Sequence, residues 1–124
     1  MSLHDAGRIL NPVLFDGQVR GGFAMAIGAA LYERLVYAED GGFLTGSFAD
    51  YAVPTASMIP ELEILHMESP SPLTPLGAKG VAEGNAMSTP VCIANGVADA
   101  LGVVEISLPL TPDRMLELLK RRPR

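Results

Sequence analysis

NPVLFDGQVRGGFAMAIGAAL, residues 11–31, carries the strongest helical pattern in the chain. Asn11 is a good helix cap, and Pro12 suits the first helical position. Apolar residues then recur mostly four positions apart and predict one apolar face: Val13, Phe15, Val19, Phe23, Ile27, Leu31 and Leu35. Glycines at 17, 21, 22 and 28 each cost helix stability of up to ~1 kcal/mol relative to alanine. They indicate either close approach by a backbone or ligand, or tight packing of the helix on a sheet.

Shorter elements are predicted on the C-terminal side of this helix. A cap followed by proline starts one helix at 88–90, with Gly102 as its stop. Thr111-Pro112-Asp113 starts another helix that runs into the basic residues 120–124. Strands or extended segments are predicted at 43–45, 47–54, 62–67 and 106–108, whereas three prolines exclude regular structure at 69–77. Together these elements predict an α+β fold in which helices pack on a small mixed sheet.

Composition limits the functions open to the chain. It has 124 residues, of which 14 are acidic and 9 basic, giving a net charge of −5. This balance argues against binding to nucleic acid or to an anionic membrane, so we interpret the basic residues 120–124 as a solvated helix end. The single cysteine, Cys92, excludes an intramolecular disulfide and a cysteine-cluster metal site, and its apolar surroundings predict a core position. No transmembrane or secretory segment is read, and we expect a cytoplasmic location.

The combination of apolar and loop-forming residues is unusual for a complete small protein. Mean hydropathy is +0.28, although 13 residues are glycine and 10 are proline. We therefore expect either that a partner covers part of the surface or that the chain is a piece of something larger. Residues 1–3 are treated as a candidate cloning remnant, which leaves residues 4–124 for the fold.

The glycine-rich segment GAKGVAEGN, residues 77–85, is the best candidate for chemistry. Its glycines let a backbone come close to a bound group and present N–H donors to anions. Lys79 adds a positive charge, and Glu83 is a candidate general base, a role that desolvation of its carboxylate would favour. From the pattern alone, a plain glycine-rich turn with exposed charges stays open as the alternative.

Several segments also carry a family resemblance in collinear order: HDAGRILNP at 4–12, GQV and GG within 17–22, TGSFADYAVP at 45–54, SPSP at 69–72, GAKGVAE at 77–83, ANGVADAL at 94–101 and PLTP at 109–112. Together they resemble the molybdenum-cofactor-binding large subunit of the xanthine dehydrogenase, aldehyde oxidase and aerobic carbon monoxide dehydrogenase family. The resemblance covers nearly the whole chain but only the C-terminal end of that much longer subunit. It therefore implies a C-terminal portion of a molybdopterin-binding domain.

The resemblance also implies roles for individual residues. Glu83 falls on the family's catalytic glutamate, the general base in hydroxylation of a substrate carbon. Gln18 falls on a glutamine that hydrogen-bonds the molybdenum-molybdopterin cofactor, and Lys79 and Gly80 are further cofactor-binding candidates. No protein ligand to a metal is implied. The family usually has glycine where this chain has Ala82, and a positive φ angle there would strain the turn before Glu83.

The implied partners are the remaining part of the molybdenum subunit and the iron–sulfur and flavin subunits. We expect the isolated chain to bind no cofactor, to be inactive and to form homo-oligomers through its apolar surface. Two other hypotheses stay open. In the first, the chain is a non-catalytic remnant or assembly module of such an enzyme. In the second, it is a free-standing binder of small anions that uses residues 77–84.

Overall fold

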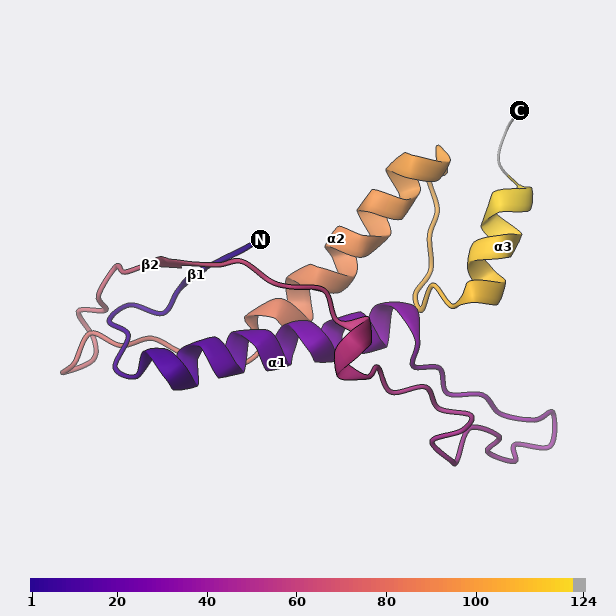
Figure 1. The fold of residues 1–124 in the computed structure, drawn as a ribbon, viewed down its shortest axis with the longest axis horizontal. Helices are drawn as coiled ribbons and strands as arrows, with labels where there is room; N and C mark the ends of the chain where they lie inside the picture. The colour runs from indigo at the N-terminus through magenta and orange to yellow at the C-terminus, as the bar shows by residue number, and fades with distance from the viewer. Residues whose placement is uncertain (122–124) are drawn as a thin grey trace.

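The longest element of the fold is the helix predicted from residues 11–31, and the other elements are arranged along it (Figure 1). We describe residues 1–121 from a computed structural model. In chain order the elements are β1 (Ser2–Asp5), α1 (Pro12–Leu31), the short 3-10 helix η1 (Ala56–Met58), β2 (Ile64–Met67), α2 (Gly84–Leu101) and α3 (Pro112–Lys120).

Helix α1 begins as predicted but ends earlier. The Asn11 side chain accepts a hydrogen bond of 3.1 Å from the N–H of Leu14, and Pro12 is the first helical residue. The helix ends at Leu31, so the predicted continuation to Leu35 is wrong. A long excursion follows, in which the predicted strand 43–45 is reduced to one bridge between Tyr37 and Phe43, and residues 47–51 form turns instead of an extended segment.

The sheet lies over the N-terminal half of α1 (Figure 1). Strands β1 and β2 pair in parallel, from Ser2 with Ile64 to Asp5 with Met67, and one antiparallel bridge joins Gly7 to Ala78. The α+β class is confirmed. Strand β1 was not predicted, because residues 1–3 were set aside, yet Ser2 and Leu3 form its first half. Residues 106–108 form no strand.

Helix α2 starts at Gly84, before the predicted start at Ser88. Pro90 therefore lies inside the helix, where its missing N–H leaves the helical hydrogen-bond ladder incomplete. The stop at Gly102 is confirmed, since this residue adopts the left-handed conformation with φ of 66°. Helix α3 starts at Pro112 as predicted, and the end of the basic segment, residues 122–124, lies outside the described residues.

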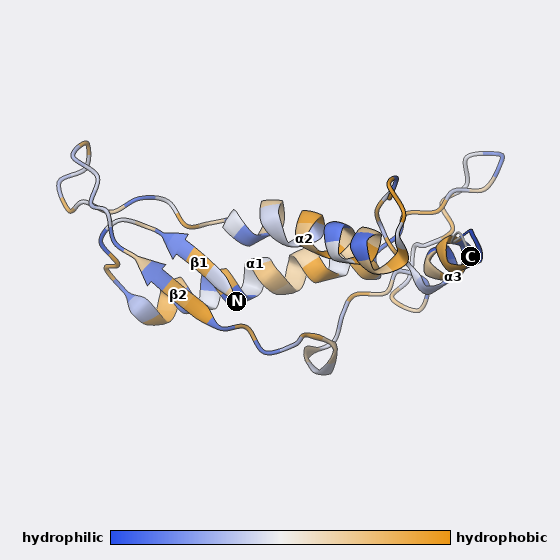
Figure 2. Cartoon of the chain, turned by 90° about the horizontal axis from the view of Figure 1, so that it is seen from above, coloured by the Kyte–Doolittle hydropathy of each residue, from blue (hydrophilic) through white to orange (hydrophobic). Residues whose placement is uncertain are grey.

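The main hydrophobic core is small and lies between β1, α1 and β2. Ala6, Phe15, Val19 and Leu62 are buried together, and α2 packs across α1 (Figure 1). Helices α1 and α2 contain many hydrophobic residues along their length (Figure 2), and several of these, such as Val13 and Val91, are exposed outside this core. Cys92 is one of them: the prediction of a core position is wrong, because α1 covers only one side of α2. None of the helices within residues 1–121 has the length and apolarity needed to cross a membrane.

The glycines of α1 have different surroundings. A Cβ atom at Gly28 would overlap the Glu33 carboxylate and lie 3.0 Å from the Pro54 ring, so the groups close to this glycine are side chains and not the backbone or ligand that was expected. At Gly17 and Gly21 a Cβ atom would meet nothing within 4 Å. These two glycines face open space within the described part of the chain.

Candidate functional site

The glycine-rich segment 77–85 is fixed to the turn that follows β1. Gly7 and Gly77 both have positive φ angles, 63° and 72°, and their backbones touch. The N–H of Arg8 donates to the carbonyl of Gly77 at 3.1 Å, and the N–H of Lys79 donates to the carbonyl of Ala6 at 2.8 Å. A Cβ atom at either glycine would collide with backbone or with Pro70, so the turn pair requires glycine.

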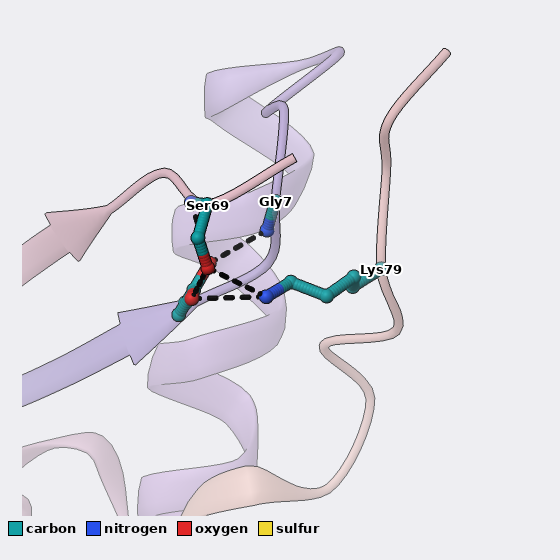
Figure 3. Close-up of polar contacts among 4 residues, drawn as sticks. Gly7, Ser69 and Lys79 are labelled. Atoms are coloured by element: carbon teal, nitrogen blue, oxygen red, sulfur yellow. Dashed lines mark hydrogen bonds and ion pairs between the residues drawn. The ribbon is translucent and has the colours of Figure 1, made fainter. Parts of the chain in front are cut away.

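The ammonium group of Lys79 is directed toward Asp5 (Figure 3). Its Nζ atom lies 2.9 Å from Asp5 Oδ2 and 2.9 Å from Ser69 Oγ. Ser69 donates its hydroxyl to the same carboxylate, and the Gly7 N–H donates to Asp5 Oδ1 at 2.9 Å. These hydrogen bonds, that of Ser69 most, hold the pKa of Asp5 well below its usual range. Lys79 therefore ties the segment to β1.

Gln18 connects α1 to the same segment. Its Nε2 atom donates to the carbonyl of Ala82 at 2.7 Å, and its Oε1 atom has no partner within residues 1–121. Gln18, Lys79 and Ala82 line one groove of about 470 Å³, together with Arg8 and the start of α1. The structure thus brings Gln18 and Lys79 together at one surface, whereas Gly80 and Glu83 belong to the same segment but do not line the groove.

Glu83 is the residue immediately before α2 and is exposed. The desolvation considered for its carboxylate is absent in this chain, because Glu83 itself is exposed. Within the described residues the carboxylate forms no hydrogen bond and no ion pair. Ala82 does not have a positive φ angle, since every positive φ angle in residues 1–121 is at a glycine. Alanine in place of the family's glycine therefore does not strain this turn.

Four residues near this segment were not singled out from the sequence. Arg8 lines the groove with an exposed guanidinium that has no ion pair in the described chain. Asp5 and Ser69 hold Lys79, and Asn85 is buried behind Glu83 with 3% of its surface exposed. Arg8, Asp5 and Ser69 lie inside the family-like segments 4–12 and 69–72, which was the available signal; no sequence signal marks Asn85 as buried.

Comparisons with known proteins show what the chain as a whole is similar to. Residues 1–60 match a family model described as a molybdopterin cofactor-binding domain. The nicotine 6-hydroxylase large subunit of Paenarthrobacter nicotinovorans is 42% identical over 122 residues, which are 96% of this chain and 15% of that protein. The xanthine dehydrogenase molybdenum-binding subunit of Escherichia coli O157:H7 is 39% identical over 118 residues, 94% of this chain and 16% of that protein.

A solved structure, that of quinoline 2-oxidoreductase from Pseudomonas putida 86, superposes with a TM-score of 0.90 and 38% identity over 98% of this chain and 16% of that one. The chain thus spans about 15% of the length of the curated relatives that it matches. Their names identify them as subunits of larger enzymes. This chain belongs to the family of molybdenum-binding large subunits that includes xanthine dehydrogenases, aldehyde oxidoreductases and carbon monoxide dehydrogenases, and corresponds to a segment of their molybdopterin cofactor-binding domain.

Proposed function

We propose that this chain is the C-terminal part, residues 4–124, of the cofactor-binding domain of a molybdenum hydroxylase. In the assembled enzyme Glu83 is the general base, and Gln18, Lys79 and Gly80 contact the cofactor. The partners are the rest of the molybdenum subunit and the iron–sulfur and flavin subunits. The chain alone is inactive. The cytoplasmic location expected from the sequence stays a prediction.

One observation carries this proposal: the segment that bears Glu83 is held firmly while the carboxylate itself is left without a partner. The backbone is tied to β1 through Gly77 and Lys79 and to α1 through Gln18. The Glu83 carboxylate, by contrast, is exposed and unbonded in the described chain. A carboxylate used only for stability would be expected to make an ion pair or a cap, whereas a general base must keep its oxygens available for a proton.

The groove beside this segment has donors and acceptors that suit a pterin cofactor. Gln18 keeps its Oε1 atom available after donating through Nε2, so its amide can still accept a hydrogen bond from a pterin edge. Arg8 offers a cation for a phosphate group, and a Cβ atom at Gly80 would meet nothing within 4 Å, so a bound group can approach its backbone. These residues therefore fit the cofactor. Lys79 contributes through its backbone, since Asp5 occupies its ammonium group.

The molybdenum-molybdopterin cofactor supplies the two-electron oxidation that accompanies hydroxylation of a substrate carbon. The contribution of this chain is to receive a proton on the Glu83 carboxylate at the start of the reaction and to release it afterwards. The residues around it contribute orientation, because Gln18 and the backbone of residues 77–82 hold the segment that carries Glu83.

The test is to purify the chain with its native partners from its host and to measure partner masses and molybdenum content on the same sample. We expect molybdenum and co-purifying polypeptides. In that enzyme Glu83→Gln keeps the molybdenum content but lowers kcat by about a hundredfold or more, the range typical of losing a general base. Glu61→Gln is the matched control, since Glu61 is exposed and lies outside the segment.

Turnover of the Glu83→Gln enzyme at the unsubstituted rate would refute the general base. A chain that purifies free of metal and partners would favour the alternative of a non-catalytic remnant. That alternative has less support than the sequence suggested, because Ala82 adopts a backbone conformation open to any residue.

A further inference from the structure

The backbone around Glu83 is held on both sides by side chains. On the N-terminal side, Gln18 holds the carbonyl of Ala82. On the C-terminal side, Gly84 packs against the ring of His4 so closely that a Cβ atom at residue 84 would lie 2.9 Å from His4 Cε1. His4 and Gly84 do not line the groove that contains Gln18 and Lys79. Binding of the cofactor in that groove therefore does not explain why these two residues are in contact.

Asn85 completes this second set of contacts and joins three elements. Its Oδ1 atom accepts the Ser2 hydroxyl at 2.8 Å and lies 3.2 Å from His4 Nε2, both on β1. Its Nδ2 atom donates to the carbonyl of Val19 on α1 at 2.9 Å. Since Asn85 Oδ1 can only accept, its contact with His4 requires a proton on Nε2, an atom that also lies 2.9 Å from the Ser2 hydroxyl oxygen. The first turn of α2 is therefore fixed by a buried amide with partners at both ends.

We propose that His4 and Asn85 are positioning residues for Glu83. They fix the first turn of α2 against β1 and α1 and thereby set the direction in which the Glu83 side chain leaves the backbone. This inference rests on the proposed role of Glu83 as general base. The exposed carboxylate has no contact of its own in the described chain, so its placement depends on its backbone. Loss of a buried partner would leave Asn85 unsatisfied and free the turn to shift.

The variants are made in the molybdenum enzyme purified from its host with its partners. His4→Phe keeps an aromatic ring beside Gly84 and Phe15 but removes the ring nitrogens. Asn85→Leu removes both the Oδ1 acceptor and the Nδ2 donor of the side-chain amide. His4→Gln is the conservative variant, because its side-chain amide can restore an N–H near the position of Nε2.

The matched control is His66→Phe. His66 packs on Phe15, with ring centroids 4.8 Å apart, but makes no hydrogen bond to Asn85. It therefore has the same chemistry as His4 and the same aromatic neighbour without the contact that the inference uses.

We expect His4→Phe and Asn85→Leu to lower kcat by about tenfold or more, with KM and molybdenum content unchanged, because small displacements of a catalytic group cost much of the rate. His4→Gln restores kcat to within about threefold, and His66→Phe leaves it unchanged. Hydrogen exchange provides a readout besides activity. The amides of residues 84–88 exchange faster in His4→Phe and Asn85→Leu, while residues 95–101 and the His66→Phe enzyme exchange as in the unsubstituted enzyme.

Unchanged kcat together with unchanged exchange at residues 84–88 would overturn the inference. Its failure is distinguishable from that of the proposed function. If Glu83→Gln abolishes turnover while the His4 and Asn85 variants keep their kcat, only the positioning role fails. If the Glu83→Gln enzyme keeps its turnover rate, the proposal that Glu83 is the general base is refuted. The positioning role of His4 and Asn85 is then refuted as well, whatever the result of hydrogen exchange.

Discussion

At the scale of single residues, the ion pair between Asp5 and Lys79 makes the stability of the chain depend on pH. Hydrogen bonds from Ser69, Lys79 and Gly7 lower the pKa of Asp5 in the folded chain, whereas an aspartate in an unfolded chain titrates near pH ~3.9. The folded state therefore holds a proton on Asp5 less readily than the unfolded state. The resulting stabilisation is fully present above the unfolded pKa and is lost as the pH falls toward the folded value.

We expect Asp5→Asn to lower the free energy of unfolding at pH 7, and this difference from the unsubstituted chain to shrink as the pH falls below about 4. Urea unfolding at several pH values measures the difference directly. Asp99→Asn is the control, because Asp99 is exposed on α2 and makes no side-chain hydrogen bond or ion pair within residues 1–121. A difference for Asp5→Asn that stays constant from pH 7 to pH 3 would contradict this account.

Gly77 is the second residue whose substitution has a definite expected effect. Its φ angle of 72° is in the left-handed region, and a Cβ atom would lie 2.9 Å from Pro70 Cβ. We expect Gly77→Ala to destabilise the chain by about 1–3 kcal/mol, measured by urea unfolding. Gly17→Ala is the opposite control: nothing lies within 4 Å, and alanine in a helix interior is expected to stabilise by about 0.5–1 kcal/mol. Equal effects at the two positions would mean that the turn pair of Gly7 and Gly77 does not require glycine.

The sequence allowed some of the site residues to be proposed but not their contacts. Glu83 and Gln18 lie in motifs with a recognisable order, and the bond from Gln18 to Ala82 brings their segments together. The direction of the Lys79 ammonium and the burial of Asn85 both depend on β1. That strand is recognisable only through its pairing with β2, far away in the sequence, and local patterns do not encode such a pairing.

At the scale of elements, α1 and α3 were predictable because their starts combine a cap residue with proline. The same reasoning failed for α2, where Ser88-Thr89-Pro90 has the pattern of a start but lies inside the helix. Tertiary contacts explain the difference: Asn85 and Gly84 are held by β1 and α1, which stabilises a helical turn ahead of the proline. The predicted strand at 43–45 is reduced to a single bridge with Tyr37. The strand predicted at 106–108 does not form, because within residues 1–121 no second strand lies beside it.

Pro90 therefore offers a test of how α2 is stabilised. Proline in a helix interior costs about 3 kcal/mol relative to alanine in isolated helices. We expect Pro90→Ala to raise the free energy of unfolding by about 1–3 kcal/mol, since it supplies the N–H that the ladder lacks. Circular dichroism during urea unfolding measures the change. Val91→Ala is the control for altered side-chain size, because Val91 is exposed on the same helix. A loss of stability in Pro90→Ala would mean that the proline ring makes packing contacts that outweigh the missing hydrogen bond.

At the scale of the whole molecule, the chain exposes more apolar surface than an isolated small protein usually does. The outer side of α1 exposes Val13, Leu14 and Met25, of which Val13 is 81% exposed, alongside the open glycines 17 and 21. This face is rigid because it is helical. The chain spans about 15% of the length of its relatives, so we expect this apolar face to be covered by the rest of the subunit.

We therefore expect the isolated chain to self-associate through this face. Sedimentation velocity at about 1 to 100 µM should show species larger than the 13.1 kDa monomer, increasing with concentration. Val13→Glu combined with Met25→Glu should shift the chain toward the monomer, because two buried charges at an apolar contact are costly. Leu73→Glu is the control: Leu73 is 91% exposed but lies in the proline-rich loop, which offers no continuous surface. A monomer at every concentration, or an equal effect of Leu73→Glu, would show that the outer face of α1 is not the contact surface.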